Sequence, residues 1–187
     1  MEIDCVSNNQ QLKPIIFKSE TIISKNELDI TLDNSRNIFS LNQNRQETKN
    51  FKKKFNSFFL FEPPSISELY ISEKYMAFWV RNNSFLIIGD VNLKDLKSVF
   101  SDTASMTDQT GGWISIQIEG KASKSIFEKL ININLDQFIE GRVIRTSINK
   151  INCFVLCQNK FYKYTIICPM SYYENMKQRL VNLANLI

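Results

Sequence analysis

The fold of this chain is decided by residues 112–120, which read Gly-Trp-Ile-Ser-Ile-Gln-Ile-Glu-Gly. Ile114, Ile116 and Ile118 alternate with polar residues, and side chains two positions apart on a strand point to the same face. The alternation predicts a strand with one buried face, and Gly120 provides the break that ends it.

A helix, three strands and a second helix are expected after this strand. Apolar residues within 122–130 recur at helical spacing and predict a short helix. Dense β-branched and aromatic residues predict strands at about 142–148, 151–157 and 161–168. Pro169 closes the last strand, and the apolar residues from Tyr173 onward line one face of a C-terminal helix.

The first half of the chain predicts a similar mixture. Residues 28–41 favour a strand or a hairpin that turns at Asp33–Ser35. Phenylalanines at helical spacing predict a helix within residues 43–59, which the Pro63-Pro64 pair ends.

The clearest hairpin joins strands at 75–81 and 84–89 across Asn82-Asn83, because asparagine tolerates a positive φ. Asn92 then caps a helix that ends near Ser101. This order of elements predicts an α+β fold of two small α/β lobes, with helices packed on antiparallel or mixed sheets. We expect a flexible N-terminal arm at residues 1–19 and a single domain at 20–187, with lobes at about 20–108 and 109–187.

The composition of the 187 residues excludes several kinds of site. Histidine is absent, which rules out Ser-His-Asp and Cys-His nucleophilic sites and histidine-ligated metals. The five glycines form neither a dinucleotide-binding motif nor a P-loop. The acidic N-terminus predicts no signal peptide and the apolar runs are short, so we expect a cytoplasmic protein without a membrane span.

Thiols and carboxylates are the remaining chemical groups to weigh. Cys153, Cys157 and Cys168 would be three ligands of a metal site, but structural zinc usually takes four. We therefore expect buried, inert thiols and no metal. The acidic residues Asp90, Asp95, Asp102 and Asp108 are interpreted as turn and helix-cap residues, with no catalytic pair.

Basic and aromatic residues are candidates for partner contact. The Lys52–Lys54 run is interpreted as a solvated helix face. Arg142 and Arg145 lie an odd step apart on one strand, so they point to opposite faces, and at least one is a candidate partner contact. Trp79 and Trp113 are expected in the core. Residues 111–187 are the basic part of the chain. Over the whole chain, however, lysine outnumbers arginine 17 to 6, and bidentate contacts to phosphates and bases prefer arginine, so the composition does not favour nucleic-acid binding.

The chain resembles the gamma subunit of heterotetrameric sarcosine oxidase, well over residues 70–187 and loosely over 20–70. The similarity is carried by an ordered series of packing and turn residues: 112–120, Ala122, Leu130, Leu135-Asp136, Phe138, Gly141-Arg142, Thr146, Pro169–Tyr173 and the tryptophan hairpin at 77–80 and 85–89. The family's Cys-Pro pair is replaced here by Ile131–Asn134.

The resemblance implies a fold like the folate-binding domain of aminomethyltransferase and an accessory role without catalytic or cofactor-binding residues. It implies partners in the alpha, beta and delta subunits, chiefly alpha. FAD, FMN, NAD, tetrahydrofolate and zinc would belong to those subunits. The complex would demethylate sarcosine oxidatively to glycine.

Three other interpretations remain open from the sequence. The chain could serve a paralogous N-methyl amino acid dehydrogenase that has a similar subunit. It could be a free-standing folate-binding one-carbon protein of the same fold. An RNA-binding domain that uses the basic C-terminal part is a third interpretation, which predicts steeply salt-dependent binding.

Overall fold

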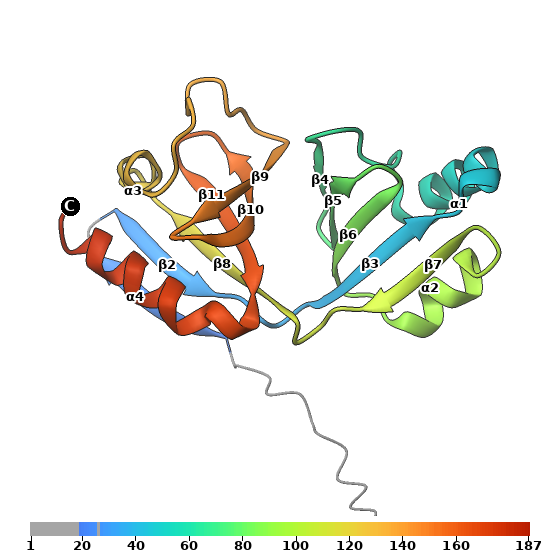
Figure 1. The fold of residues 1–187 in the computed structure, drawn as a ribbon, viewed down its shortest axis with the longest axis horizontal. Coiled ribbons are helices and arrows are strands. Elements are labelled where there is room, and N and C mark those ends of the chain that lie inside the picture. Colours follow the sequence, from blue (N-terminus) through green and yellow to red (C-terminus); the bar gives the residue numbers. More distant parts are fainter. Residues whose placement is uncertain (1–18, 26) are drawn as a thin grey trace, which may run out of the picture.

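The computed structural model describes residues 19–25 and 27–187, and the expected N-terminal arm at 1–19 lies almost wholly outside them. Within them the chain forms two antiparallel sheets and four α-helices (Figure 1), which confirms the α+β class. The larger sheet has the order β1 (Glu20–Lys25), β2 (Leu28–Leu32), β8 (Trp113–Glu119), β11 (Lys163–Pro169), β10 (Ile151–Asn159), β9 (Arg142–Ile148). The smaller sheet has the order β4 (Leu69–Ile71), β5 (Tyr75–Arg81), β6 (Ser84–Gly89), β3 (Asn37–Gln43), β7 (Ala104–Asp108).

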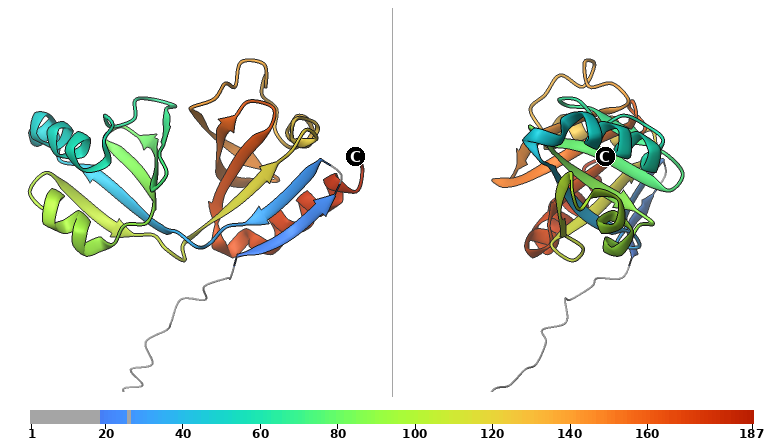
Figure 2. Two further views of the ribbon diagram at one scale, coloured as in Figure 1. Left: turned by 180° about the vertical axis from the view of Figure 1, so that it is seen from behind. Right: turned by 90° about the vertical axis from the view of Figure 1, so that its right-hand side faces the viewer.

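The helices lie on the outer sides of the two sheets (Figures 1 and 2). The larger sheet carries α3 (Ser123–Leu130) and α4 (Tyr173–Ala184), and the smaller sheet carries α1 (Thr48–Phe59) and α2 (Leu93–Phe100). Short 3-10 turns, Arg45–Glu47 and Met170–Tyr172, precede α1 and α4. The inner faces of the sheets are therefore free to meet each other.

The core of the larger sheet is mostly aliphatic. Ile114, Ile116 and Ile118 are each fully buried beneath α3 and α4, as the alternation predicts. Gly120 ends β8 with a φ of +122°, and a Cβ there would lie 2.0 Å from the carbonyl oxygen of Glu27. Only glycine allows the chain to pass that close.

The core of the smaller sheet is aromatic. Phe51, Phe55 and Phe59 of α1 are buried at the predicted helical spacing, and Phe55 lies 5.8 Å from Phe85 of β6, centroid to centroid. The helix ends at Phe59, before the proline pair, because Leu60 adopts a left-handed conformation that stops it. The predicted cap of α2 is confirmed: Asn92 Oδ1 accepts the Asp95 N–H at 2.9 Å.

Two details differ from the sequence predictions. Residues 28–41 do not form a hairpin, because β2 pairs with β1 and β8 whereas β3 pairs with β6 and β7 in the other sheet. The lobes also do not divide the chain simply near residue 108. β1 and β2 complete the sheet of the later segment, since their apolar residues pack with Ile116 and Ile118. No helix among the described residues is long and apolar enough to cross a membrane.

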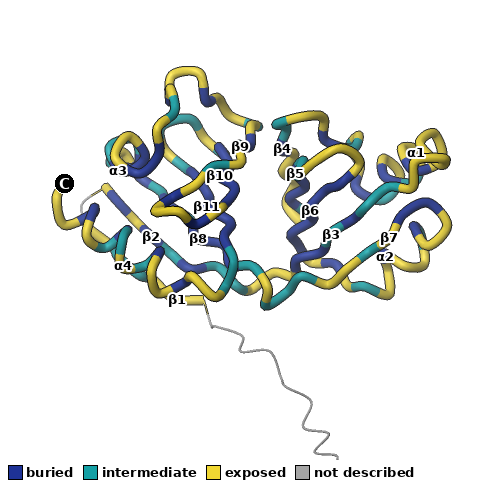
Figure 3. The backbone as a smooth tube through the Cα atoms, in the orientation of Figure 1, coloured by how far each residue is buried: buried dark blue, intermediate teal, exposed yellow. Residues whose placement is uncertain are grey.

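A third apolar cluster joins the two sheets. We name this cluster the seam, because its buried residues pack between the two sheets. It consists of Ile38, Leu69, Met76, Phe78, Leu86 and Ile88 from the smaller sheet, and Val143, Phe154, Leu156 and Ile167 from the larger. The rings of Phe78 and Phe154 meet at 5.4 Å across it. Most of β6, β10 and β11 is accordingly coloured as buried in Figure 3.

Candidate functional site

The inner faces of the sheets change from apolar to polar along their length. On each of three strands, alternate residues point to the inner face, and they become more polar toward one end. From the apolar to the polar end, these residues are Ile38, Ser40 and Asn42 in β3, Ile88, Leu86 and Ser84 in β6, and Leu156, Phe154 and Asn152 in β10. Asn42 pairs with Ser84 within the smaller sheet, and the polar ends of the two sheets meet because Asn42, Ser84 and Asn152 line one hollow. The seam therefore continues into a polar region between the sheets.

A cleft of about 340 Å³ occupies this polar region. Both sheets line it: Ser40, Asn42, Val80, Arg81, Ser84, Phe85 and Leu86 come from the smaller sheet, Trp113, Arg145, Asn152, Cys153 and Phe154 from the larger, and Gln109 from the connection between them. A partly apolar hollow with a few convergent polar groups between two layers is the usual form of a binding site.

The charged groups of the cleft are two arginines. Arg81 Nε donates to Ser84 Oγ at 3.2 Å, and Ser84 Oγ donates to Asn42 Oδ1 at 2.7 Å. The Arg145 guanidinium lies 6.0 Å from the ring centroid of Phe154. Neither arginine forms an ion pair with any residue between 19 and 187 that the structure describes. Both guanidinium groups are therefore available to a carboxylate.

A second depression of about 810 Å³ adjoins the cleft at the β5–β6 turn. It shares Asn42, Arg81 and Ser84 with the cleft and adds Arg45 and Trp79, together with the amides Gln43, Asn82 and Asn83. Trp79 and Trp113 are half-buried at the edges of these hollows. Trp113 packs against the seam, as core packing predicts, whereas Trp79 joins none of the three core clusters, so the expectation is wrong for Trp79. Each lies near the end of its strand, where the packed core opens to solvent.

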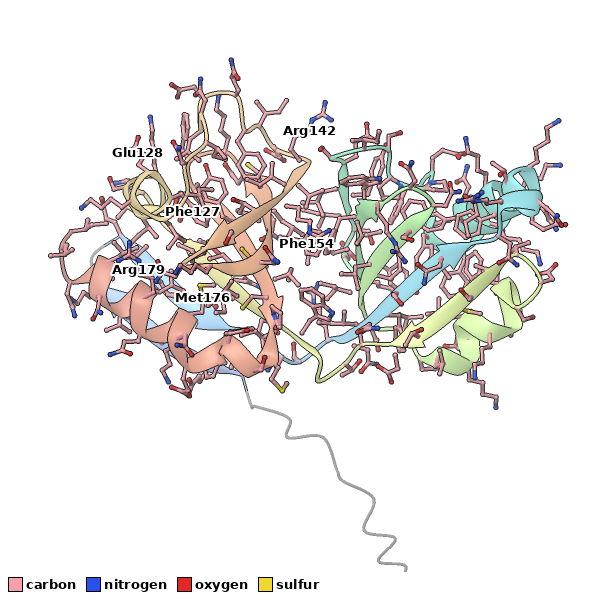
Figure 4. All side chains as sticks on the ribbon, in the orientation of Figure 1. Phe127, Glu128, Arg142, Phe154, Met176 and Arg179 are labelled. Atoms are coloured by element: carbon pink, nitrogen blue, oxygen red, sulfur yellow. The ribbon has the colours of Figure 1, made fainter. Side chains whose placement is uncertain are left out.

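The two predicted partner-contact residues lie in different surroundings. Arg145 lines the cleft, on the inner face of β9. Arg142 shares the opposite face with Ile144, which packs on the helix-side core, so the odd spacing placed them correctly. Arg142 is exposed, and its backbone pairs with Glu68 where the edges of the two sheets meet (Figure 4).

Three of the four cysteines lie within the described residues. Cys153, Cys157 and Cys168 are buried free thiols on the helix side of β10 and β11. Burial raises the pKa of Cys153 to about 11 and those of Cys157 and Cys168 to about 12. At neutral pH these thiols are protonated, which makes them poor nucleophiles and metal ligands. Among the residues that the structure describes, no group of three potential ligands gathers.

The acidic candidates are dispersed, as the turn and cap interpretation predicts. Asp95 lies in the first turn of α2. Asp102 accepts from Lys54 Nζ at 2.6 Å, and this hydrogen bond lowers the pKa of its carboxyl. Asp108 accepts the Thr110 N–H at 2.8 Å. Lys52 and Lys53 are exposed on α1, as expected for a solvated helix face, whereas Lys54 is half-buried and pairs with Asp102.

A further pocket of about 340 Å³ lies between α4 and the β9–β10 turn. Arg179 lines it together with Tyr172, Asn149, Asn175, Gln178 and Asn182. The Nε of Arg179 is buried without a hydrogen-bond partner in the described part of the chain. Nothing in the sequence pattern singled out this arginine, because α4 predicts only its apolar face.

The arrangement between the sheets suits recognition better than proton transfer. Its polar groups are guanidinium, amide and hydroxyl, and the one thiol, Cys153, holds its proton at neutral pH because its pKa is raised by burial. Such groups bind and orient an anion through hydrogen bonds. Sequence reasoning identified Arg145 but missed Arg81, Ser84 and Asn42, which only the register of three strands brings together.

Solved structures show where this architecture occurs. A chain of heterotetrameric sarcosine oxidase from Corynebacterium sp. U-96, in a complex with pyrrole 2-carboxylate, superposes with a TM-score of 0.74 at 16% identity. The match covers 87% of this chain and 86% of that one. This chain shares the fold of a sarcosine oxidase chain.

A second similar structure is the glycine cleavage system aminomethyltransferase from Bartonella henselae, with a TM-score of 0.57 at 6% identity. That match covers 84% of this chain but only 46% of the aminomethyltransferase, so this chain spans less than half of that enzyme. No family model matches the sequence. No curated protein matches it either.

Proposed function

We propose that this chain is a non-catalytic subunit, equivalent to gamma, of a heterotetrameric sarcosine oxidase. The observation that carries the proposal is the match with the sarcosine oxidase chain, which runs nearly end to end in both proteins. The likeness therefore extends over most of a sarcosine oxidase chain. The aminomethyltransferase, of which the match covers 46%, is the contrasting case.

The chemistry of the chain supports an accessory role. Its buried thiols are protonated at neutral pH, and the cleft between its sheets presents arginine and amide donors. In this proposal the alpha, beta and delta subunits hold FAD, FMN, NAD, tetrahydrofolate and zinc, and the complex works in the cytoplasm. The complex oxidises sarcosine to glycine, with formaldehyde or methylene-folate and hydrogen peroxide as the other products.

Co-expression tests the proposal. The tagged chain is produced alone and with the alpha, beta and delta subunits of its own organism, and sarcosine-dependent hydrogen peroxide formation is measured. We expect a colourless chain alone and a yellow, active complex that loses stability or assembly when this chain is omitted. A complex that forms and oxidises sarcosine equally well without the chain contradicts the proposal.

The same complex distinguishes the dehydrogenase alternative. A paralogous N-methyl amino acid dehydrogenase would pass electrons to a dye but would not produce hydrogen peroxide. Comparing peroxide formation with dye reduction, for sarcosine and for N-methylglutamate as substrates, assigns the complex to one of the two reactions.

The similarity to aminomethyltransferase favours one further candidate, a free-standing folate-binding protein. Trp113 lines the inter-sheet cleft and packs against Phe154 at 5.8 Å, so a ligand that enters should change its fluorescence. Titrating the isolated chain with tetrahydrofolate tests this candidate. A saturable change that Trp113→Phe abolishes supports it, and a flat titration removes it.

A further inference from the structure

The cleft and the depression beside it form one continuous surface because they share Asn42, Arg81 and Ser84. We name this surface the arginine groove, after Arg45, Arg81 and Arg145, all of which are exposed along it. It begins between the sheets, next to the seam, and continues to the β5–β6 turn.

The composition of the arginine groove differs from that of the chain as a whole. Three of the six arginines and both tryptophans line it, whereas none of the described residues that line it is Lys, Asp or Glu. The chain carries 17 lysines and 19 acidic residues, so the described lining of the groove differs clearly from the composition of the whole chain. Enrichment in arginine and tryptophan with depletion of lysine and carboxylates is the composition of protein–protein contact centres.

The charges of the groove define the partner that fits it. The three guanidinium groups form no ion pair within residues 19–25 and 27–187. Each can hold a carboxylate with two parallel hydrogen bonds, which a lysine cannot do. Arg81 is already held by Ser84 through its Nε, so its outer nitrogens are oriented before a partner arrives.

We propose that the arginine groove binds a carboxylate-rich segment of a partner polypeptide. The proposal rests on the proposed function only for the identity of that partner, a larger subunit of the same complex. Single-stranded nucleic acid fits less well, because it needs aromatic faces free for base stacking. The ring of Trp113 packs against Phe154, so one of its faces is already covered.

The first experiment measures complex formation with co-expressed large subunits. The double charge reversal Arg81→Glu with Arg145→Glu is compared with Arg36→Glu, an exposed arginine outside the groove. We expect the double variant to reduce retention of the chain on the tagged large subunits by at least about tenfold, since facing like charges oppose binding. Arg36→Glu should leave retention unchanged, and circular dichroism confirms that each variant folds.

The second experiment uses the isolated chain, so it does not depend on the proposed function. The probe is a fluorescein-labelled peptide of alternating glutamate and phenylalanine, read by anisotropy, with oligo(dT) as the nucleic-acid comparison. We expect saturable peptide binding that the double variant loses and Arg36→Glu keeps. Tighter binding of oligo(dT) than of the peptide overturns the proposal.

The two experiments separate the possible failures. If the wild-type chain forms no complex with the large subunits, the proposed function fails, and the peptide alone decides whether the groove binds carboxylates. A loss in either experiment that Arg36→Glu does not reproduce supports the groove. If the double variant behaves like the wild type in both experiments, the groove is overturned even when the complex forms.

Discussion

The seam and the arginine groove are two ends of the same inter-sheet face, and they are built for different tasks. At the seam, Phe78 and Phe154 are buried and in contact, so this end holds the two layers together. At the groove, Arg81 and Arg145 are exposed and form no ion pair within the described chain. One strand serves both ends, since β10 carries Phe154 at the seam and Asn152 at the groove.

The comparison teaches that stability and recognition can be separated along a single pair of sheets. Apolar area removed from water stabilises the seam by roughly 25 cal/mol per Å². Exposed arginines contribute little to folding, because solvent screens them. Substitutions at the two ends should therefore affect different measurements.

The largest effect is expected at the seam. Phe78 is fully buried against Phe154, so Phe78→Ala removes a ring that spans the two layers. We expect the free energy of unfolding to fall by about 3–5 kcal/mol, measured by urea denaturation. Phe78→Leu, which fills most of the space, should cost clearly less. Equal losses for both variants would show that the ring contact between the layers is not what stabilises them.

The other face of β10 supplies the next prediction, which concerns the thiols. Their pKa values are raised by burial from about 9 to about 11 for Cys153 and about 12 for Cys157 and Cys168. As the pH rises above 9, the unfolded chain releases thiol protons that the folded chain keeps. The free energy of unfolding should therefore decrease between pH 9 and 11.

The measurement is the urea midpoint at pH 8 and at pH 10. A variant with all three cysteines replaced by alanine is the control, because it keeps the tyrosines and lysines that also titrate in this range. Its stability should depend less on pH than that of the wild type. The same alkaline loss in the variant would mean that the thiols do not cause it.

Much of the architecture could be predicted from local pattern alone. The alternation at Ile114–Ile118 and the phenylalanine spacing of α1 each report which face is buried, and the structure confirms both. Three strands were missed. β1 is largely exposed at a sheet edge, β4 has only three residues, and β7 reads Ala-Ser-Met-Thr-Asp with little apolar signal.

The groove shows why the site was harder to predict. Arg145 was singled out because it lies an odd step from Arg142 on one strand, but its neighbours Arg81 and Asn42 are far from it in sequence. The packing of one sheet on the other brings these residues together. Periodicity within a strand shows which face of that strand is buried, but it does not show which other strand packs against it. The contact between Phe78 and Phe154 in the seam could not be predicted either, because in the sequence each looks like an ordinary core residue of a separate strand.

A smaller effect is expected at the boundary between seam and groove. Ser84 is buried there, and its hydroxyl accepts from Arg81 Nε and donates to Asn42. Ser84→Ala removes both hydrogen bonds, so we expect a loss of about 0.5–1.5 kcal/mol in the free energy of unfolding. The same variant should weaken binding of the glutamate–phenylalanine peptide, because Arg81 loses the group that orients it. Ser57→Ala, at an exposed position of α1 outside the groove, is a control that should change neither measurement.

The smallest effect on stability is expected for charge reversal in the groove itself. Arg145→Glu changes an exposed side chain that forms no ion pair in the part of the chain described, so the free energy of unfolding should stay within about 0.5 kcal/mol of the wild type. Thermal and urea denaturation measure this change, with Arg36→Glu as the reference for a reversal elsewhere on the surface. A loss as large as that of Phe78→Ala would show that the guanidinium helps to hold the sheets together. The seam would then extend through the cleft, and the separation between a stabilising end and a binding end would be wrong.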